Sequence, residues 1–352
     1  MLLRRTARLI AVVAIVLGAG GISLATPAFA CACGGVAIPD GGTPVQVDGE
    51  TALVGWDGTT ETILMRLALR SGGDRAALIV PTLTPATVTA GKSDTFTELT
   101  RLTAPEVVID RRVESGGGDR AGAAAPTEAP TVLARVELGP LEATTLTGGD
   151  VTGIQRWLSD NGYVMRPEVI ATLQPYLSEG WSFVAMRLTA TALSGELDPV
   201  RVSFASDRLV YPMRMSSAAT RTQSVHLYVL AEHRVRRSDA DAAAQTVTVD
   251  FAGRVSGSSD PDLRQLSASG RDYLTELTVL ISTPAAIAHD FTFTNAPDDS
   301  GYRRVVHRTE TVRGFDSDGD SVVKIVVLSV MSVISILVVV WLLRRLSRRA
   351  RP

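Results

Sequence analysis

Glu61–Arg70 reads ETILMRLALR, and large apolar side chains recur in it at every second position. This period places alternate side chains on opposite faces, which is typical of a β-strand with a buried face. Thr51–Trp56 precedes it as another apolar run, and Gly58 between the two favours a turn. The segment therefore predicts an antiparallel hairpin within a sheet-rich fold.

Further strands are predicted where short apolar, β-branched runs lie between turn residues. These runs are 76–80, 107–109, 132–138, 141–146, 182–192, 200–204, 209–215, 224–230, 246–251 and 273–282. Pro81 is expected to end the first run, because the segment PTLTP at 81–85 cannot continue a central strand. Residues 36–50 are rich in Gly, Pro and Asp and predict a loop.

Three helices are predicted from apolar residues at helical spacing. Ser93–Asp94 is expected to cap a helix that runs to Leu102. A second helix starts after Asp150 and ends at Gly162, and a third begins at Pro167 and ends at Gly180. Because helices are grouped between runs of strands, we expect an α+β fold: mostly antiparallel sheets with a central pair of helices, plus one C-terminal transmembrane helix.

The segment 115–130, SGGGDRAGAAAPTEAP, contains no bulky apolar residue and predicts a flexible Gly/Ala/Pro-rich loop. It divides an N-terminal lobe, 31–114, from a C-terminal lobe, 131–313. The alternative is an exposed loop within one domain. Residues 314–324 predict a stalk that is polar over most of its length.

Residues 1–30 have the pattern of a secretory signal peptide. Three arginines within the first eight residues precede an apolar run at 9–17, and Ala28-Phe29-Ala30 places small residues at positions −3 and −1 of a cleavage site. Cleavage is therefore predicted between Ala30 and Cys31, and an uncleaved N-terminal anchor is the alternative. Phe29 is too bulky for a good lipoprotein signal, which argues against lipidation of Cys31.

Ile325–Leu343 is an uncharged apolar run of 19 residues, IVVLSVMSVISILVVVWLL. As a helix it would be roughly 28 Å long, close to the hydrocarbon thickness of about 30 Å. Five arginines follow the run: Arg344, Arg345, Arg348, Arg349 and Arg351. Because positive residues stay on the cytoplasmic side, we expect a single-pass protein of the cell membrane with a cytoplasmic C-terminus, 344–352, and an extracytoplasmic N-terminal body.

The charge of the chain is unevenly distributed. The chain has 35 Lys and Arg against 37 Asp and Glu, and nine of the basic residues lie in the signal and in 321–352, where no acid occurs. The body between them keeps 26 basic and 37 acidic residues, a net charge of −11. This charge argues against a nucleic-acid partner. The expected partners are the lipid bilayer, through the C-terminal helix, and an envelope protein or peptide.

Several sequence blocks are similar, in order, to those of a known family. They are a Cys-Gly-Gly start after the signal, VPTLTP at 80–85, TFTELTRLTAPEV at 95–107, WLSDNGY at 157–163, GWSFVAMRL at 180–188, LDPVRVSFASDRLVYPMRMS at 197–216 and HLYVL at 226–230. Over about residues 33–285 the chain thereby resembles the bacterial domain of unknown function family 2330, and its Ala- and Arg-rich composition is similar to that of actinobacterial members. The resemblance implies an exported, mostly membrane-tethered protein and supplies no catalytic residue.

Cys31 and Cys33 are the most reactive candidates. Outside the cytoplasmic membrane thiols tend to oxidise, so a local or intermolecular disulfide is the leading interpretation. A soft-metal site for Cu(I), redox catalysis, a thiol-based sensor and a free or lipidated Cys31 are the alternatives.

No catalytic, cofactor or metal motif is present in the sequence, so we expect a binding or envelope-interaction module rather than an enzyme. The alternative is a hydrolase-type enzyme with acid and base brought together only by the fold, for which Asp160, Glu168 and Glu179 are candidates. His226 is expected to be packed or paired within a strand. Three tryptophans are interpreted as core or groove residues, with carbohydrate stacking by one of them as an alternative: Trp56, Trp157 and Trp181.

Overall fold

The computed structural model describes residues 30–31, 34–42, 45–71, 76–112, 135–138, 141–188, 198–311 and 328–331. The signal segment up to residue 29, Cys33, the segment 115–130, the stalk 314–324 and the basic tail 344–352 lie outside these residues. Among the described residues, no helix has the length and hydropathy needed to cross a bilayer. The apolar run 325–343 is described only at 328–331, which is helical.

The predicted hairpin is present. Strand β3 (Val45–Trp56) pairs antiparallel with β4 (Thr60–Ser71), and Gly58 has a φ of +97° in the turn between them. Glycine adopts positive φ without the steric penalty of a side chain. Ile63 and Met65, which share one phase of the alternation in β4, are fully buried. The hairpin therefore lies at the core, as its periodicity indicated.

Two large sheets carry most of the strands. The first sheet has the order β1-β2-β5-β11-β9-β8, with β10 paired to β2. Its bounds are β1 Ala30–Cys31, β2 Gly34–Ile38, β5 Ala77–Thr82, β8 Arg135–Leu138, β9 Leu141–Leu146, β10 Val164–Met165 and β11 Ser182–Leu188. Both sheets take strands from either side of the segment 115–130.

The second sheet has the order β19-β16-β17-β14-β3-β4-β12-β6. Its further bounds are β6 Thr87–Ala90, β12 Val200–Ala205, β14 Gln223–Ala231, β16 Thr246–Arg254, β17 Tyr273–Ile281 and β19 Tyr302–Arg303. Neighbouring strands in this sheet run antiparallel, except β3 and β14, which are parallel with Glu50 opposite Val225. The structure is thus sheet-rich and largely antiparallel, with few helices.

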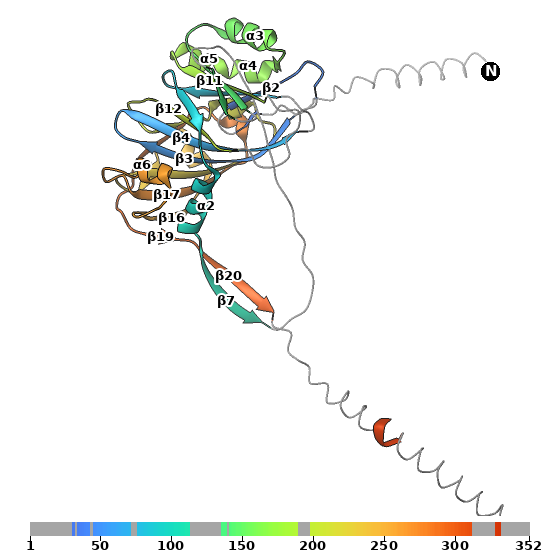
Figure 1. Cartoon of the computed structure of the whole chain (residues 1–352), viewed down its shortest axis with the longest axis vertical. Helices are drawn as coiled ribbons and strands as arrows, with labels where there is room; N and C mark the ends of the chain where they lie inside the picture. The colour runs from blue at the N-terminus through green and yellow to red at the C-terminus, as the bar shows by residue number, and fades with distance from the viewer. Residues whose placement is uncertain are drawn as a thin grey trace, which may run out of the picture. The chain divides into compact units, whose positions relative to one another are not determined.

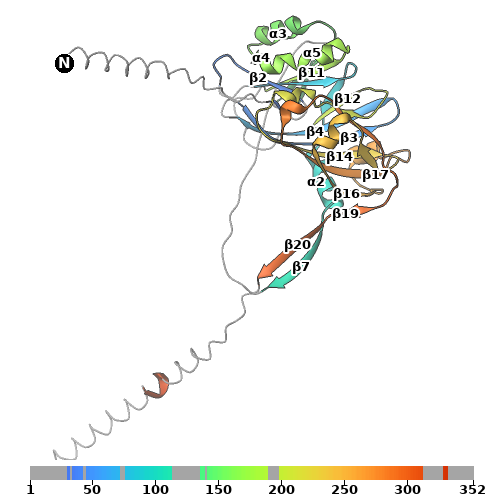
Figure 2. The same cartoon turned by 180° about the vertical axis from the view of Figure 1, so that it is seen from behind.

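The sheets pack face to face, and helices cover their outer faces. Leu78 and Val184 of the first sheet share a buried core with Val54 and Leu227 of the second. Helices α3 (Val151–Asp160), α4 (Pro167–Ala171) and α5 (Leu173–Ser178) pack on the outer face of the first sheet. Helices α2 (Ser93–Leu102) and α6 (Pro261–Leu266) pack on the outer face of the second. Figures 1 and 2 show these two helix groups on opposite sides of the sheets.

A small third sheet lies beside this sandwich and positions the candidate site. It has the order β13-β18-β15, with β13 Val210–Tyr211, β18 Phe291–Asn295 and β15 Val235–Arg237. The adjoining 3-10 turns are η1 Arg214–Ala218, η2 Ala240–Ala244 and η3 Pro284–Ala286. Because β13 follows β12 after a short loop, side chains of that loop reach both the large and the small sheet.

The helix predicted from Asp150 to Gly162 is confirmed. The Asp150 carboxylate accepts a hydrogen bond from the Gly153 amide at 2.7 Å, and Gly162 has a φ of +79° beyond the C-terminus. A cap of this kind contributes about 1 kcal/mol to helix stability. The predicted cap of α2 is wrong: Lys92 holds the cap position and makes no side-chain cap, while the Ser93 hydroxyl donates to Asp198 at 3.3 Å.

Prolines correct three further predictions. The predicted helix after Pro167 is broken into α4 and α5, because Pro175 cannot donate a hydrogen bond to Ala171 and its ring clashes with that carbonyl. The predicted strand 209–215 stops at Tyr211, since Pro212 follows and η1 begins at Arg214. Pro81 instead continues β5, where it lies opposite Phe183 of β11. The pairing of β5 with β2 covers only Ala77–Ile79, so the missing amide of Pro81 costs no bond to β2.

Residues 36–50, predicted as a loop, contain the end of β2 and the start of β3. Gly34 and Gly35 are buried in β2 because the chain passes very close to its neighbours there. A Cβ on Gly34 would lie 2.3 Å from the Ile79 carbonyl oxygen. These glycines therefore permit close strand packing rather than a loop.

The chain forms two units. The first comprises Met1–Glu106 and Arg120–Val306, and it holds all three sheets described above. The second comprises Val107–Asp119 and His307–Pro352. Strands β7 (Glu106–Arg112) and β20 (Val305–Thr311) pair with each other, and most of this ribbon belongs to the second unit.

Candidate functional site

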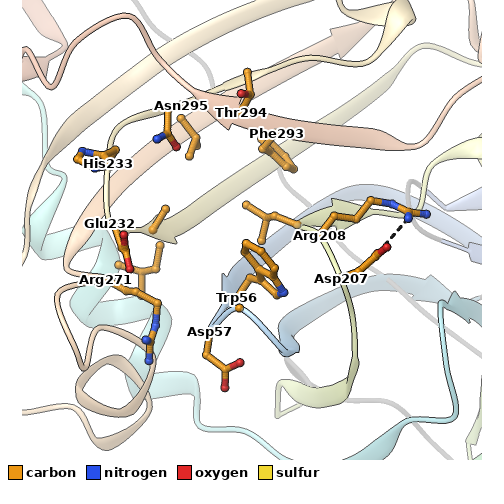
Figure 3. A pocket seen from close by; sticks show the side chains of 15 residues that line it. Trp56, Asp57, Asp207, Arg208, Glu232, His233, Arg271, Phe293, Thr294 and Asn295 are labelled. Atoms are coloured by element: carbon orange, nitrogen blue, oxygen red, sulfur yellow. Dashed lines mark hydrogen bonds and ion pairs between the residues drawn. The ribbon is translucent and has the colours of Figure 1, made fainter.

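A pocket of about 390 Å³ opens where the β3–β4 turn, the β12–β13 loop and strand β18 meet (Figure 3). Its volume lies within the range of about 300–1,000 Å³ that is usual for small-molecule sites. Its lining residues are Trp56, Asp57, Gly58, Asp207, Arg208, Leu209, Leu230, Ala231, Glu232, His233, Val235, Arg271, Phe293, Thr294 and Asn295. We call it the first pocket.

Two aromatic side chains form part of its wall. Trp56 and Phe293 are partly buried and pack against the core between the sheets. The Trp56 indole N–H donates to the Ser206 carbonyl at 3.0 Å, which fixes the ring and uses its one donor. Trp56 therefore offers the pocket apolar ring surface in a fixed orientation, and no hydrogen-bond donor.

The β3–β4 turn is rigid at the edge of the pocket. The Asp57 carboxylate accepts hydrogen bonds from the amides of Thr59 at 2.9 Å and Thr60 at 2.7 Å. These two hydrogen bonds lower the pKa of Asp57 below its ordinary value of 3.8, and the bond from Thr60 has the larger effect. Asp57 is consequently a carboxylate at neutral pH and holds the turn that presents Trp56.

Three polar groups around the pocket make no hydrogen bond or ion pair with other described residues, although the charge of one of them, Arg271, helps to lower the pKa of Asp57. The Glu232 carboxylate, the Arg271 guanidinium and the Asn295 amide make no hydrogen bond or ion pair with another residue that the structure describes. His233 is held in place by Asp299, at 2.9 Å from its ring nitrogen. In Figure 3, Glu232, Arg271 and His233 lie across the pocket from Phe293 and Trp56. The pocket thus combines an apolar wall with free donors and acceptors.

A second, smaller pocket of about 220 Å³ shares Arg208 with the first. Its centre is Arg214, which binds Glu179 through both terminal nitrogens at 2.5 and 2.8 Å and Asp290 through Nε at 2.8 Å. Asp239, which also lines it, is bound by the buried Arg237. Each carboxylate of this pocket is therefore committed to an arginine.

Asp290 joins several segments at the second pocket. Besides Arg214 Nε, it accepts hydrogen bonds from the Tyr176 hydroxyl at 2.5 Å and from the amides of Met213 at 2.7 Å and Arg214 at 3.1 Å. Burial, and next the Asp290 charge, raise the pKa of Tyr176 well above its ordinary value. The hydrogen bonds from Arg214 lower the pKa of Glu179. Tyr176 is therefore protonated and Glu179 ionised near neutral pH, which suits a structural network.

His226 lies in strand β14 and is paired, as predicted, with a residue of the neighbouring strand β17. Its Nε2 lies 2.7 Å from a carboxylate oxygen of Glu276 on the outer face of the second sheet. Burial, and next the Glu276 charge, raise the pKa of the neighbouring Tyr228 to about 12. Neither His226 nor Glu276 lines either pocket.

Two buried glutamates were not anticipated. Glu61 is fully buried and accepts a hydrogen bond from the Val210 amide at 3.2 Å, and burial raises its pKa well above the ordinary value. Glu50 accepts a hydrogen bond from the Tyr211 hydroxyl. A signal for Glu61 was present, because it shares the phase of Ile63 in the alternating segment. Both glutamates thus join the second sheet to β13.

The structure separates the residues proposed for an enzyme. Asp160 and Glu168 are exposed and line neither pocket, whereas Glu179 lines the second pocket. Cys31 lies opposite Gly34 in the β1–β2 pair, and the disulfide prediction for Cys31 and Cys33 stays untested because Cys33 is outside the described residues. Within the part of the chain that the structure describes, no group of three or more His, Cys, Asp or Glu is placed to hold a metal ion.

The three tryptophans have different surroundings. Trp157 packs from α3 against the core beneath the helices, and Trp181 is buried at the second pocket. Trp56 lines the larger, first pocket. Of the groove positions considered from the sequence, Trp56 is therefore the one beside uncommitted polar groups.

Comparisons with known proteins give a family and little else. The family described as "Uncharacterized protein conserved in bacteria (DUF2330)" matches residues 27–294. None of the curated proteins matches the chain. Among solved structures, a mutated baculovirus P35 after caspase cleavage is 8% identical, with 67% of this chain and 99% of that chain covered and a TM-score of 0.32. At that TM-score the likeness carries no argument about fold or function.

Proposed function

Because the chain belongs to the DUF2330 family of uncharacterized bacterial proteins, whose members supply no activity to transfer, we propose its function from its own residues: an extracytoplasmic binding module held at the cell membrane by one C-terminal helix. The location rests on the signal-like residues 1–30 and on the apolar run 325–343 with the arginines behind it.

The binding role rests on one observation, the contrast between the two pockets. In the second pocket every carboxylate is neutralised by an arginine, so none is left to act as a general acid or base. In the first pocket Glu232, Arg271 and Asn295 are free of such partners beside a fixed aromatic wall. Uncommitted polar groups around an apolar surface favour ligand recognition.

The location is tested by protease treatment of intact cells that make the chain with a peptide tag after Pro352. We expect the body to be digested while the tag stays protected, because the arginine tail lies inside. Digestion of the tag in intact cells, or recovery of the chain as a freely soluble protein, would contradict the proposed topology.

The binding role is tested by co-sedimentation of the full-length chain, in detergent micelles, with purified envelope material. Ala231→Trp should abolish binding, because Ala231 lines the first pocket and a bulky ring there would fill it. Ala243→Trp is the matched control, since Ala243 is exposed on η2 and lines neither pocket. Equal sedimentation of both variants, with matching circular dichroism spectra, would refute the role assigned to the pocket.

A further inference from the structure

We propose that the first pocket binds an uncharged sugar unit of an envelope glycan, stacked on Trp56 and Phe293. This inference rests on the proposed binding function and names the ligand class of the same site. It follows from three properties of the pocket: its ring surfaces, the mixed character of its polar groups, and its size.

The ring surfaces match the apolar face of a sugar. A pyranose ring presents C–H groups on its flat faces and hydroxyls around its edge. Trp56 and Phe293 are partly buried against the core, and a hydrogen bond also holds the Trp56 ring, so stacking on their exposed surface costs little side-chain ordering. With its N–H bonded to Ser206, Trp56 has only such stacking to offer.

The polar groups match the edge of a sugar. Each hydroxyl both donates and accepts a hydrogen bond, so a site for several hydroxyls needs acceptors and donors side by side. Glu232 supplies two acceptor oxygens, Arg271 supplies donors, and the Asn295 amide supplies both. Planar carboxylate, guanidinium and amide groups can each contact two neighbouring hydroxyls at once.

The charges of the pocket argue for an uncharged ligand. Asp57, Asp207 and Glu232 oppose an anion, and Arg208 and Arg271 oppose a cation. A purely apolar ligand would leave Glu232 and Arg271 desolvated without partners, which is costly. The volume of about 390 Å³ is near the lower end of ligand sites, which suits one or two sugar rings rather than a longer buried chain.

The test is isothermal titration calorimetry of the full-length chain with three neutral probes: cellotriose, chitotriose and maltotriose. The micelles must be of a detergent without a sugar head group, because a sugar head group would compete. At least one trisaccharide should bind and change the tryptophan fluorescence, since Trp56 is in the pocket. Trp56→Ala should weaken that binding at least about tenfold, and Trp56→Phe by less, because phenylalanine keeps an aromatic face.

Two further variants, at the half-buried Arg271 and the exposed Glu232, guard against loss of folding in the Trp56 variants. Arg271→Gln and Glu232→Gln should each weaken binding roughly three- to tenfold, because each loses one charged hydrogen-bonding group. Arg236→Gln is the matched control, since Arg236 is exposed on β15 and outside both pockets, and it should bind as the unaltered chain does.

The inference is overturned if none of the three trisaccharides binds, or if Arg271→Gln and Glu232→Gln bind as tightly as the unaltered chain. Binding of triglycine in place of the sugars would also overturn it. Envelope co-sedimentation that persists after periodate oxidation of the glycans would reject the sugar ligand while leaving the binding module intact. Absence of any envelope binding by the unaltered chain would instead count against the proposed function itself.

Discussion

Asp290→Ala should destabilise the fold more than Glu179→Ala, although both carboxylates bind the same guanidinium. Asp290 is buried and accepts four hydrogen bonds, from Tyr176, Met213 and two nitrogens of Arg214. The Glu179 side chain is 47% exposed. Removal of Asp290 takes the acceptor from four donors at a buried position, although Glu179 still binds the terminal nitrogens of Arg214. Leaving buried donors unsatisfied in this way costs about 1–3 kcal/mol. Loss of Glu179 lets water replace it, for about 0–1 kcal/mol.

The assay is urea unfolding of the purified chain. The free energies of unfolding are compared between variants whose dependence on urea concentration has the same slope. Asp290→Asn serves as a shape-matched variant: it keeps an oxygen acceptor for the Met213 amide but loses the charge that faces Arg214, so its cost should fall between the other two. The reasoning is refuted if Glu179→Ala costs as much as Asp290→Ala, or if Asp290→Ala costs less than about 1 kcal/mol.

Three further outcomes are expected from other parts of the fold. Burial raises the pKa of Glu61 well above its ordinary value of 4.5. Above pH 4.5 the unfolded chain therefore releases a proton that the folded chain keeps, so the free energy of unfolding falls as the pH rises from 4.5 toward the raised pKa. Glu61→Gln should remove part of this fall between pH 5 and pH 8 in urea titrations, and an unchanged pH profile would contradict the burial argument. Gly153→Ala should raise the free energy of unfolding by about 0.5–1 kcal/mol, because the position is helical and the added Cβ would lie 3.5 Å from the nearest atom, an ordinary contact distance. A lower melting temperature of this variant would argue against the prediction. Gly34→Ala should cost about 1–3 kcal/mol, since its Cβ would meet the Ile79 carbonyl at 2.3 Å, and a neutral effect in the same titration would show that β2 can shift.

Local pattern predicted the elements whose stability is local. The alternation in 61–70 and the cap-to-glycine pattern in 150–162 each became the expected element. The prediction for 209–215 was wrong because tertiary contacts decide that segment. After Pro212, the Asp290 carboxylate accepts the Met213 and Arg214 amides, which are then not available to a strand ladder.

Gly34 and Gly35 serve packing, which composition alone does not reveal. The space beside them is filled by Ile79, Met215 and Val169. Only the neighbours across the sheet reveal that role, and these neighbours are distant in sequence. The close approach of two strands therefore cannot be predicted from the periodicity of one sequence.

The candidate site was predicted only in part. Trp56 was singled out as a core or groove residue, but its pocket is assembled from several segments between residues 56 and 295. None of these segments contains a motif, because recognition here depends on side chains that converge in space. Glu61 could have been found, since its position in phase with Ile63 places a carboxyl among inward-facing apolar residues.

The parallel pairing of β3 with β14 has a consequence for how the chain reaches its native state. Glu50 lies opposite Val225, so the middle of the second sheet joins residues separated by about half the chain. Contacts of such high sequence separation form slowly, because a long loop must close first. If the chain crosses the membrane from its N-terminus, as proposed, the backbone edge of β3 stays unpaired until β14 has emerged. We therefore expect this sheet to close late in export, after Gln223–Ala231 has crossed the membrane.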